Sequence, residues 1–275
     1  MKKIFSMALV LTFLAALLAG CGSGGTGEQA EQNEGETGTL QFRANGEDFV
    51  RQGFTSKDGW DISFDHVYVN LADVTAYQAD PPYDAHEGGE VNSETKVSIP
   101  GAQTVDLAEG DENAPPVLVG EKEVPAGHYN AISWKMLKAS EGPARGYSLV
   151  IAGQGVKDGE TINFVIKNEK EYKYTGGEFI GDKRKGIVQE GATADLEMTF
   201  HFDHIFGDAG VPADDELNVG APGFTPFAAL AKDGNVEIDM AGLQEKLSPG
   251  DYQKLDAMLT TLGHVGEGHC YCELL

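Results

Sequence analysis

The chain has 275 residues, with 44 acidic and 20 basic side chains and a formal net charge of −24. Hydrophobic residues make up 41% of it, which is enough for a buried core and excludes wholesale disorder and a small disulfide-stabilised scaffold. The acidity argues against nucleic acid as a partner, because a phosphate-binding surface needs an excess of lysine and arginine.

The N-terminus has the pattern of an export signal. Two lysines precede a run over residues 4–18 that is nearly all apolar and is short for a membrane span. The run ends in Leu18-Ala19-Gly20-Cys21, which resembles the lipobox of bacterial lipoproteins, in which the cysteine is lipidated after cleavage in front of it. The resemblance implies a signal peptide over residues 1–20, lipidation of Cys21 and attachment to the membrane through this lipid. An ordinary secretory signal with a chance cysteine is the alternative.

A tether follows the predicted anchor. Residues 22–38 hold glycine, serine and several glutamates but no large apolar side chain. This composition predicts a flexible, self-repelling chain. We therefore expect a lipid anchor and acidic linker over residues 21–38, which lets a folded domain stand away from the lipid.

Short runs of alternating polar and apolar residues dominate residues 39–206, separated by Gly, Pro and Asp turns. Two of these runs, at residues 147–151 and 161–166, flank a Gly155–Gly159 turn and predict a hairpin. The cleanest alternation covers residues 192–202, and its expected inward side chains are Ala194, Leu196, Met198, Phe200 and Phe202. The pattern predicts a mainly β fold, an antiparallel β-sandwich or barrel-like sheet.

Residues 207–275 change character towards a loop and a helical cap. An acidic, Gly- and Pro-containing loop over 207–223 precedes expected helices at 226–231 and 239–247. A third helix begins at Ser248-Pro249, where serine serves as N-cap and proline as first helical residue, and it ends at Gly263. We expect these helices to cap the β-domain rather than to form a domain of their own.

Histidines carry the candidate chemistry. The tripeptide Phe-Asp-His occurs twice, at residues 64–66 and 202–204. Strand alternation places His66 and His204 on the same faces as their inward apolar neighbours, where an imidazole needs a hydrogen bond or a metal. We expect the two to converge if their strands pair or face each other. His201 joins them only if the chain bends there. The alternative is that both are core-edge histidines held by hydrogen bonds.

The C-terminal segment Gly263–Glu273 places two histidines and two cysteines in a glycine-rich stretch. Imidazole nitrogen and thiolate sulfur suit zinc or copper. The predicted ligands of one zinc or copper ion are therefore His66, His204, His264 and His269, with His201 and Cys270 as alternates. A loose tail, or an oxidised pair of Cys270 and Cys272, remains open as another interpretation.

Catalytic motifs are mostly absent: the chain has no Gly-x-Ser-x-Gly elbow and no phosphate-binding GxxxxGK[ST] loop, so an enzyme is the third choice. The preferred hypothesis is a lipid-anchored protein of the bacterial cell envelope, outside the cytoplasm, that captures or delivers zinc or copper. A metal transporter or another envelope protein is the expected partner. The alternative is a metal-free envelope module that binds a protein or glycan and whose histidines are structural.

Several blocks resemble uncharacterised bacterial lipoproteins: Gly46-Glu47-Asp48-Phe49, Lys57-Asp58-Gly59-Trp60 leading into the first Phe-Asp-His, His201-Phe202-Asp203-His204, and the terminal Gly-His-Val-Gly-Glu-Gly-His-Cys. The block from Val117 to Tyr129 is similar to lipoprotein β-domains of unknown function, in which a Pro-Ala-Gly-x-Tyr turn starts a strand. This resemblance covers most of the mature chain and implies an extracytoplasmic β-sandwich. It brings no established activity and no established site residues.

Overall fold

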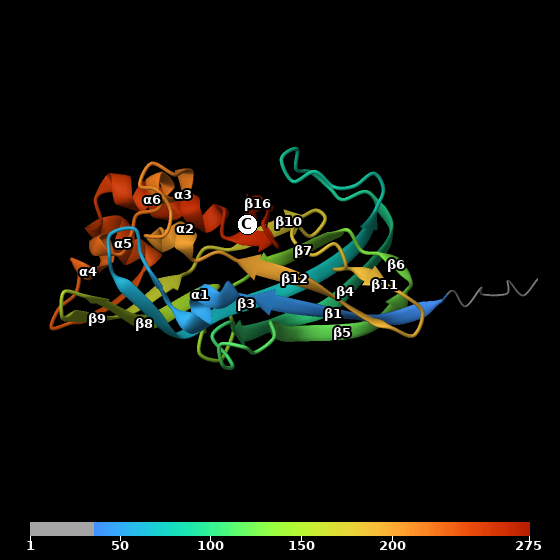
Figure 1. The fold of residues 1–275 in the computed structure, drawn as a ribbon, viewed down its shortest axis with the longest axis horizontal. Helices are drawn as coiled ribbons and strands as arrows, with labels where there is room; N and C mark the ends of the chain where they lie inside the picture. The colour runs from blue at the N-terminus through green and yellow to red at the C-terminus, as the bar shows by residue number, and fades with distance from the viewer. Residues whose placement is uncertain (1–35) are drawn as a thin grey trace, which may run out of the picture. The chain divides into compact units, whose positions relative to one another are not determined.

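Two large sheets account for most of the strands in the computed structural model, which describes residues 36–275 (Figure 1). The five-stranded sheet has the order β15-β14-β12-β1-β5. Its strands are β1 (Thr37–Asn45), β5 (Val117–Pro125), β12 (Thr193–Phe200), β14 (Gly263–Val265) and β15 (Gly268–His269). The predicted signal peptide, the lipidation at Cys21 and nearly all of the predicted linker lie outside the described residues.

The nine-stranded sheet is organised around one long strand, β3. Its main path is β13-β9-β8-β3-β7-β10-β16, and β2 and β4 also pair with β3. Its strands are β2 (Phe54–Thr55), β3 (Asp61–Ala79), β4 (Ser93–Asp106), β7 (Ala131–Met136), β8 (Leu149–Lys157), β9 (Glu160–Asn168), β10 (Tyr172–Gly176), β13 (Asn235–Asp239) and β16 (Tyr271–Leu274). A short pair, β6 (Gly127–His128) with β11 (Ile187–Val188), completes the strands of the described residues.

Side-chain alternation explains why these segments form strands. In β1 every second residue from Gly38 to Ala44 is buried, and their neighbours are partly exposed. The predicted hairpin forms between β8 and β9, where Lys157 pairs with Glu160. The two residues between them, Asp158 and Gly159, both have positive φ (50° and 84°), as a tight two-residue hairpin turn requires. Strands hold 47% of the described residues and helices 16%, so the mainly β prediction is confirmed.

Aromatic side chains join the two sheets into one core. The ring of Trp134 in β7 lies 6.0 Å from that of Phe200 at the end of β12. The ring of Phe64 in β3 lies 6.1 Å from that of Phe202, just beyond β12. Phe200, Phe202 and Trp134 are fully buried. The end of β12 is therefore packed into the shared core and provides a rigid base for the residues that follow it.

Most strand pairs are antiparallel, as expected, but two are parallel. β1 runs parallel to β12, with Leu40 beside Ala194, and β13 runs parallel to β9. Both pairs join segments that are distant in the sequence, which alternation within one strand cannot specify.

The helices of the C-terminal third gather at one end of the sheets (Figure 1). They are α2 (Asp203–Phe206), α3 (Glu216–Gly220), α4 (Thr225–Ala228), α5 (Met240–Lys246) and α6 (Pro249–Thr260), and α1 (Glu47–Gln52) lies beside β1. α6 begins as predicted, because the Ser248 side chain accepts a hydrogen bond from the Asp251 amide. Among residues 36–275, none of the helices has both the length and the apolar character needed to cross a membrane.

The C-terminal segment differs from the predicted glycine-rich loop. After α6 the chain forms β14, β15 and β16. β14 pairs with β12 of the five-stranded sheet, and β16 pairs with β10 of the nine-stranded sheet. The last dozen residues are thus built into both sheets, and the backbone pairing fixes where their histidines lie.

Candidate metal centre

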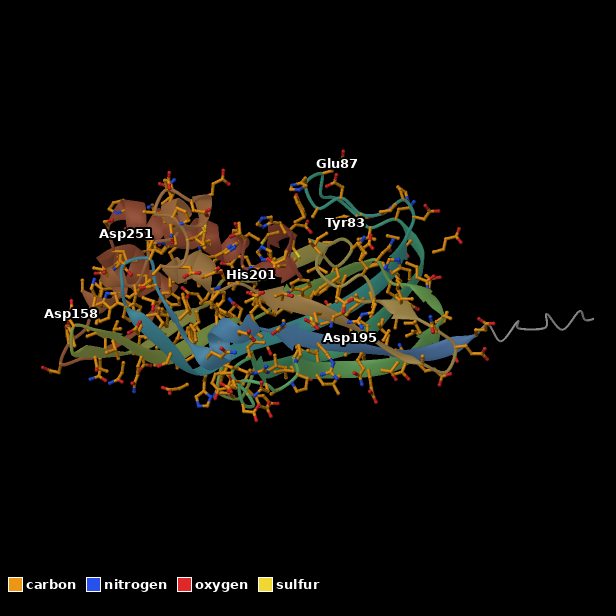
Figure 2. The ribbon with its side chains drawn as sticks, in the orientation of Figure 1. Tyr83, Glu87, Asp158, Asp195, His201 and Asp251 are labelled. Carbon is orange, nitrogen blue, oxygen red and sulfur yellow. The ribbon has the colours of Figure 1, made fainter. Side chains whose placement is uncertain are left out.

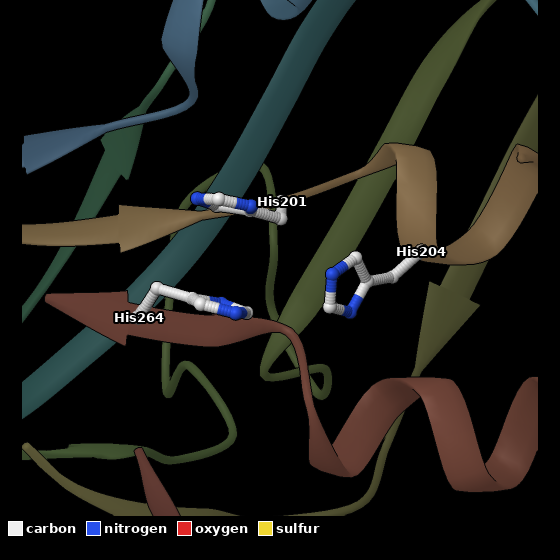
Figure 3. A group of neighbouring side chains, drawn as sticks. All are labelled: His201, His204 and His264. Carbon is white, nitrogen blue, oxygen red and sulfur yellow. The ribbon is translucent and has the colours of Figure 1, made fainter. Parts of the chain in front are cut away.

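Three imidazoles converge where β12 ends. His201 follows β12, His204 lies in α2 and His264 lies in β14. One ring nitrogen from each lies within 4.8 Å of the others, and Figure 3 shows the three side chains directed towards one another. In Figure 2 His201 lies within the body of the fold, whereas Glu87 and Asp158 mark its periphery.

Strand pairing and a change of backbone conformation create this convergence. The ladder between β12 and β14 places Thr199 opposite His264, and the amide of His201 donates to the carbonyl of Leu262. The rings of His201 and His264 therefore stack with centroids 4.0 Å apart. The chain then bends into α2, which brings His204 to the same side as His201, with its ring centroid 5.0 Å from that of His264. The sequence allowed His201 to join the site only if the chain bends after it, and the structure has this bend.

Burial keeps these imidazoles neutral. It lowers the pKa of His264 to about 2, and the neighbouring histidines lower it further. Burial, followed by the proximity of His201 and His269, lowers the pKa of His204 to about 4. Burial also lowers the pKa of His201, with Glu267 acting in the opposite direction. At neutral pH all three rings therefore carry a free lone pair, which is the form that binds metal ions.

Hydrogen bonds orient two of the rings. Nδ1 of His204 lies 2.9 Å from the Thr261 hydroxyl, which itself donates to the Met258 carbonyl, so the ring nitrogen is the donor. Nδ1 of His264 donates to the Leu262 carbonyl over 3.4 Å. Each ring thus keeps its proton on Nδ1 and its lone pair on Nε2. Metal-ligating histidines are commonly held in this way, with the second nitrogen donating to an oxygen.

Acidic side chains surround the histidines. Oε1 of Glu47 lies 3.4 Å from Nε2 of His201. Burial, then the charges of Glu267, Asp203 and Asp48, raise the pKa of Glu47 to about 7. Burial is also the largest cause that raises the pKa of Asp203 to about 6. Like charges crowded in this way favour an added cation, because a cation relieves their mutual repulsion.

Two buried polar atoms near the cluster lack a hydrogen-bond partner among the described residues. They are Nε2 of His201 and Oδ1 of Asp203. Glu47 also has a positive φ of 58°, which costs a residue with a side chain about 1–3 kcal/mol. Unpartnered buried atoms and local backbone strain are features that concentrate at functional sites.

His269 lies at the edge of the cluster. It pairs with His264 across the β14–β15 hairpin, and their ring centroids are 4.6 Å apart. Its ring lies 6.3 Å from that of His204, and the residue is exposed. With His204 it lines a pocket of about 310 Å³. The C-terminal segment thus contributes His264 to the cluster, and His269 lies beside it.

Cys270 is not part of the group of converging side chains. A methyl group built on Gly176 would lie 2.9 Å from its Sγ, so the thiol packs against β10. Burial, and then the neighbouring Cys272, raise its pKa well above the ordinary value, which disfavours the thiolate that a metal needs. Both cysteines are free, so the oxidised pair is not formed in this structure.

His66 does not join the cluster, contrary to the expectation that it converges with His204. The register of β3 against β8 shifts between Phe64 and His66. This bulge reverses the alternation, so Phe64 packs inward while His66 turns outward. Its side chain is 52% exposed, and its Nδ1 lies 2.7 Å from Oδ2 of Asp106. The repeated tripeptide brings its phenylalanines together, not its histidines.

Sequence reasoning missed the partners of the imidazoles. Glu47, Thr261 and Glu267 carry no motif, and they reach the site through α1, the end of α6 and the β14–β15 turn. A weak signal existed for Glu267, since it lies between the two C-terminal histidines.

Comparisons with known proteins found no match to this chain among family models, curated proteins or solved structures.

Proposed function

We propose that this protein is a lipid-anchored, metal-binding protein of the cell envelope that captures or delivers zinc or copper. The observation that carries the proposal is the convergence of His201, His204 and His264, with one nitrogen of each within 4.8 Å of the others. The residue types support zinc or copper, because both ions prefer imidazole nitrogen. The envelope location rests on the lipobox pattern at Cys21.

The three histidines are the proposed ligands, and His269 is proposed to bind the ion only transiently. It is exposed and lines the pocket beside His204, so it can accept an ion arriving from solvent and pass it inward. Glu47 adds a carboxyl group on the other side of His201, with Oε1 3.4 Å from Nε2 of that ring. A site that is partly open suits capture and delivery better than a fully enclosed structural site, which holds its ion with four protein ligands.

Metal analysis of the purified protein tests this function. After chelation, reloading with zinc or copper and removal of the excess, elemental analysis should give about one ion per chain. An ion held at a hundredfold excess over its Kd also adds about 2.7 kcal/mol to the free energy of unfolding, which raises the melting temperature. If neither ion is retained and neither raises the melting temperature, the metal proposal fails and the histidines are structural.

Thr261→Val tests the orientation of His204. Valine has a similar shape but cannot accept the Nδ1 proton, so we expect the metal affinity to fall by about 10- to 100-fold. Competition with a chromophoric chelator measures this change. Thr260→Val is the matched control, because its exposed hydroxyl bonds only to the Ala257 carbonyl within α6. Equal affinities for the two variants would contradict the proposed role of Thr261.

A further inference from the structure

A pocket of about 310 Å³ shares a wall with the histidine cluster. Its lining residues are His204, Glu216, Leu217, Met258, Thr261 and His269. His204 belongs both to this lining and to the three converging imidazoles. Thr261 lines the pocket while its hydroxyl bonds to His204. A molecule in the pocket would therefore lie against one ligand of the proposed metal ion.

Three imidazoles supply three of the four ligands of a tetrahedral ion, and no other His, Cys, Asp or Glu of the described residues belongs to their group. His201 and His264 stack 4.0 Å apart, and His204 stands at 90° to His264. His201 directly follows β12, and His264 and His204 lie in β14 and α2, whereas α3, the C-terminal end of α6 and β15 supply the rest of the pocket wall. Sites with three protein ligands characteristically bind an exchangeable molecule in the fourth position.

The lining indicates the chemistry of that molecule. Leu217 and Met258 supply an apolar wall, and Glu216 supplies a carboxylate. A second carboxyl group lies on the far side of the cluster, where Oε1 of Glu47 is 3.4 Å from Nε2 of His201. This concentration of acidic groups disfavours an anion. A volume of about 310 Å³ is at the small end of ligand pockets.

We infer that the metal keeps an open coordination position towards this pocket and that the position takes a small neutral nitrogen donor, an amine or an imidazole. The donor nitrogen binds the metal, and the carbon skeleton contacts Leu217 and Met258. This inference rests on the proposed metal centre and adds to it the class of the exchangeable ligand.

Cobalt substitution tests the open position, because the visible absorption of Co²⁺ reports changes in its ligands. We expect imidazole to change the spectrum of the cobalt-loaded protein in a saturable manner, and azide, an anion, to bind at least about tenfold more weakly. Leu217→Trp fills the pocket, so it should weaken imidazole binding by at least about tenfold while leaving the cobalt affinity unchanged. Val219→Trp is the matched control, since Val219 is exposed on the same helix and is not part of the lining.

The outcomes separate the two proposals. Failure to bind cobalt, zinc or copper overturns the metal centre. Tight cobalt binding with a spectrum that does not respond to imidazole overturns the open position and leaves the metal centre intact. Azide binding as tightly as imidazole overturns the ligand class. Unchanged imidazole binding in Leu217→Trp overturns the pocket as the binding site.

Discussion

His264→Ala is expected to lower the affinity for zinc or copper by more than about a hundredfold, because the loss of a direct ligand should exceed the 10- to 100-fold effect of an outer partner. The structure gives His264 the central position in the cluster. Its ring stacks on His201, stands perpendicular to His204 and lies 4.6 Å from His269. Metal competition and elemental analysis measure the effect, and circular dichroism confirms that the metal-free variant is folded.

His66→Ala is the control for this substitution. It removes an imidazole that is half exposed and bonded to Asp106, on the outer face of β3. We expect the metal affinity to stay within about twofold of the parent protein, which corresponds to less than about 0.5 kcal/mol. If His66→Ala lost the metal and His264→Ala kept it, the metal centre would include His66, as strand alternation without a bulge predicts. Our assignment of the centre would then be wrong.

Phe206→Ala is expected to lower the free energy of unfolding by about 3–5 kcal/mol, the range for truncating a buried aromatic side chain to alanine. Phe206 is fully buried in α2. Its ring lies 5.9–6.3 Å from those of Phe54, Phe64, Phe164, Phe224 and Phe227. Because α2 also carries His204, loosening this helix should weaken metal binding as well.

Urea denaturation of the metal-free protein measures the change in stability. Ile187→Ala serves as the control, since its side chain is exposed and surface substitutions usually change stability by less than about 0.5 kcal/mol. A loss below about 1 kcal/mol for Phe206→Ala would mean that the aromatic cluster does not hold α2 in place.

Local sequence patterns were sufficient for the individual strands and for the cap of α6. Alternation identified β1 and β12, and the Asp158-Gly159 turn identified the β8–β9 hairpin. The Ser248 cap identified where α6 begins. These features depend only on residues that are close in the sequence, so they can be predicted from a single sequence.

The composition of the site depends on non-local geometry, which the sequence alone did not reveal. One extra residue near Asp65 turns His66 outward, and no residue type marks this bulge. The second Phe-Asp-His behaves differently, because β12 ends at Phe200 and the chain becomes helical at Asp203. The pairing of β12 with β14 also cannot be predicted from the residues of either strand. It nevertheless determines that His264 stacks on His201.

The parallel pairing of β1 with β12 has a consequence for the order of folding. β1 is the first described strand, yet its neighbour β12 arrives only after ten other strands have been synthesised, and β14 arrives later still. Contacts between such distant segments slow folding, because a large loop must close before they form. The imidazoles can therefore meet only after the chain is available through His264, so an ion cannot serve as a template for the early steps of folding.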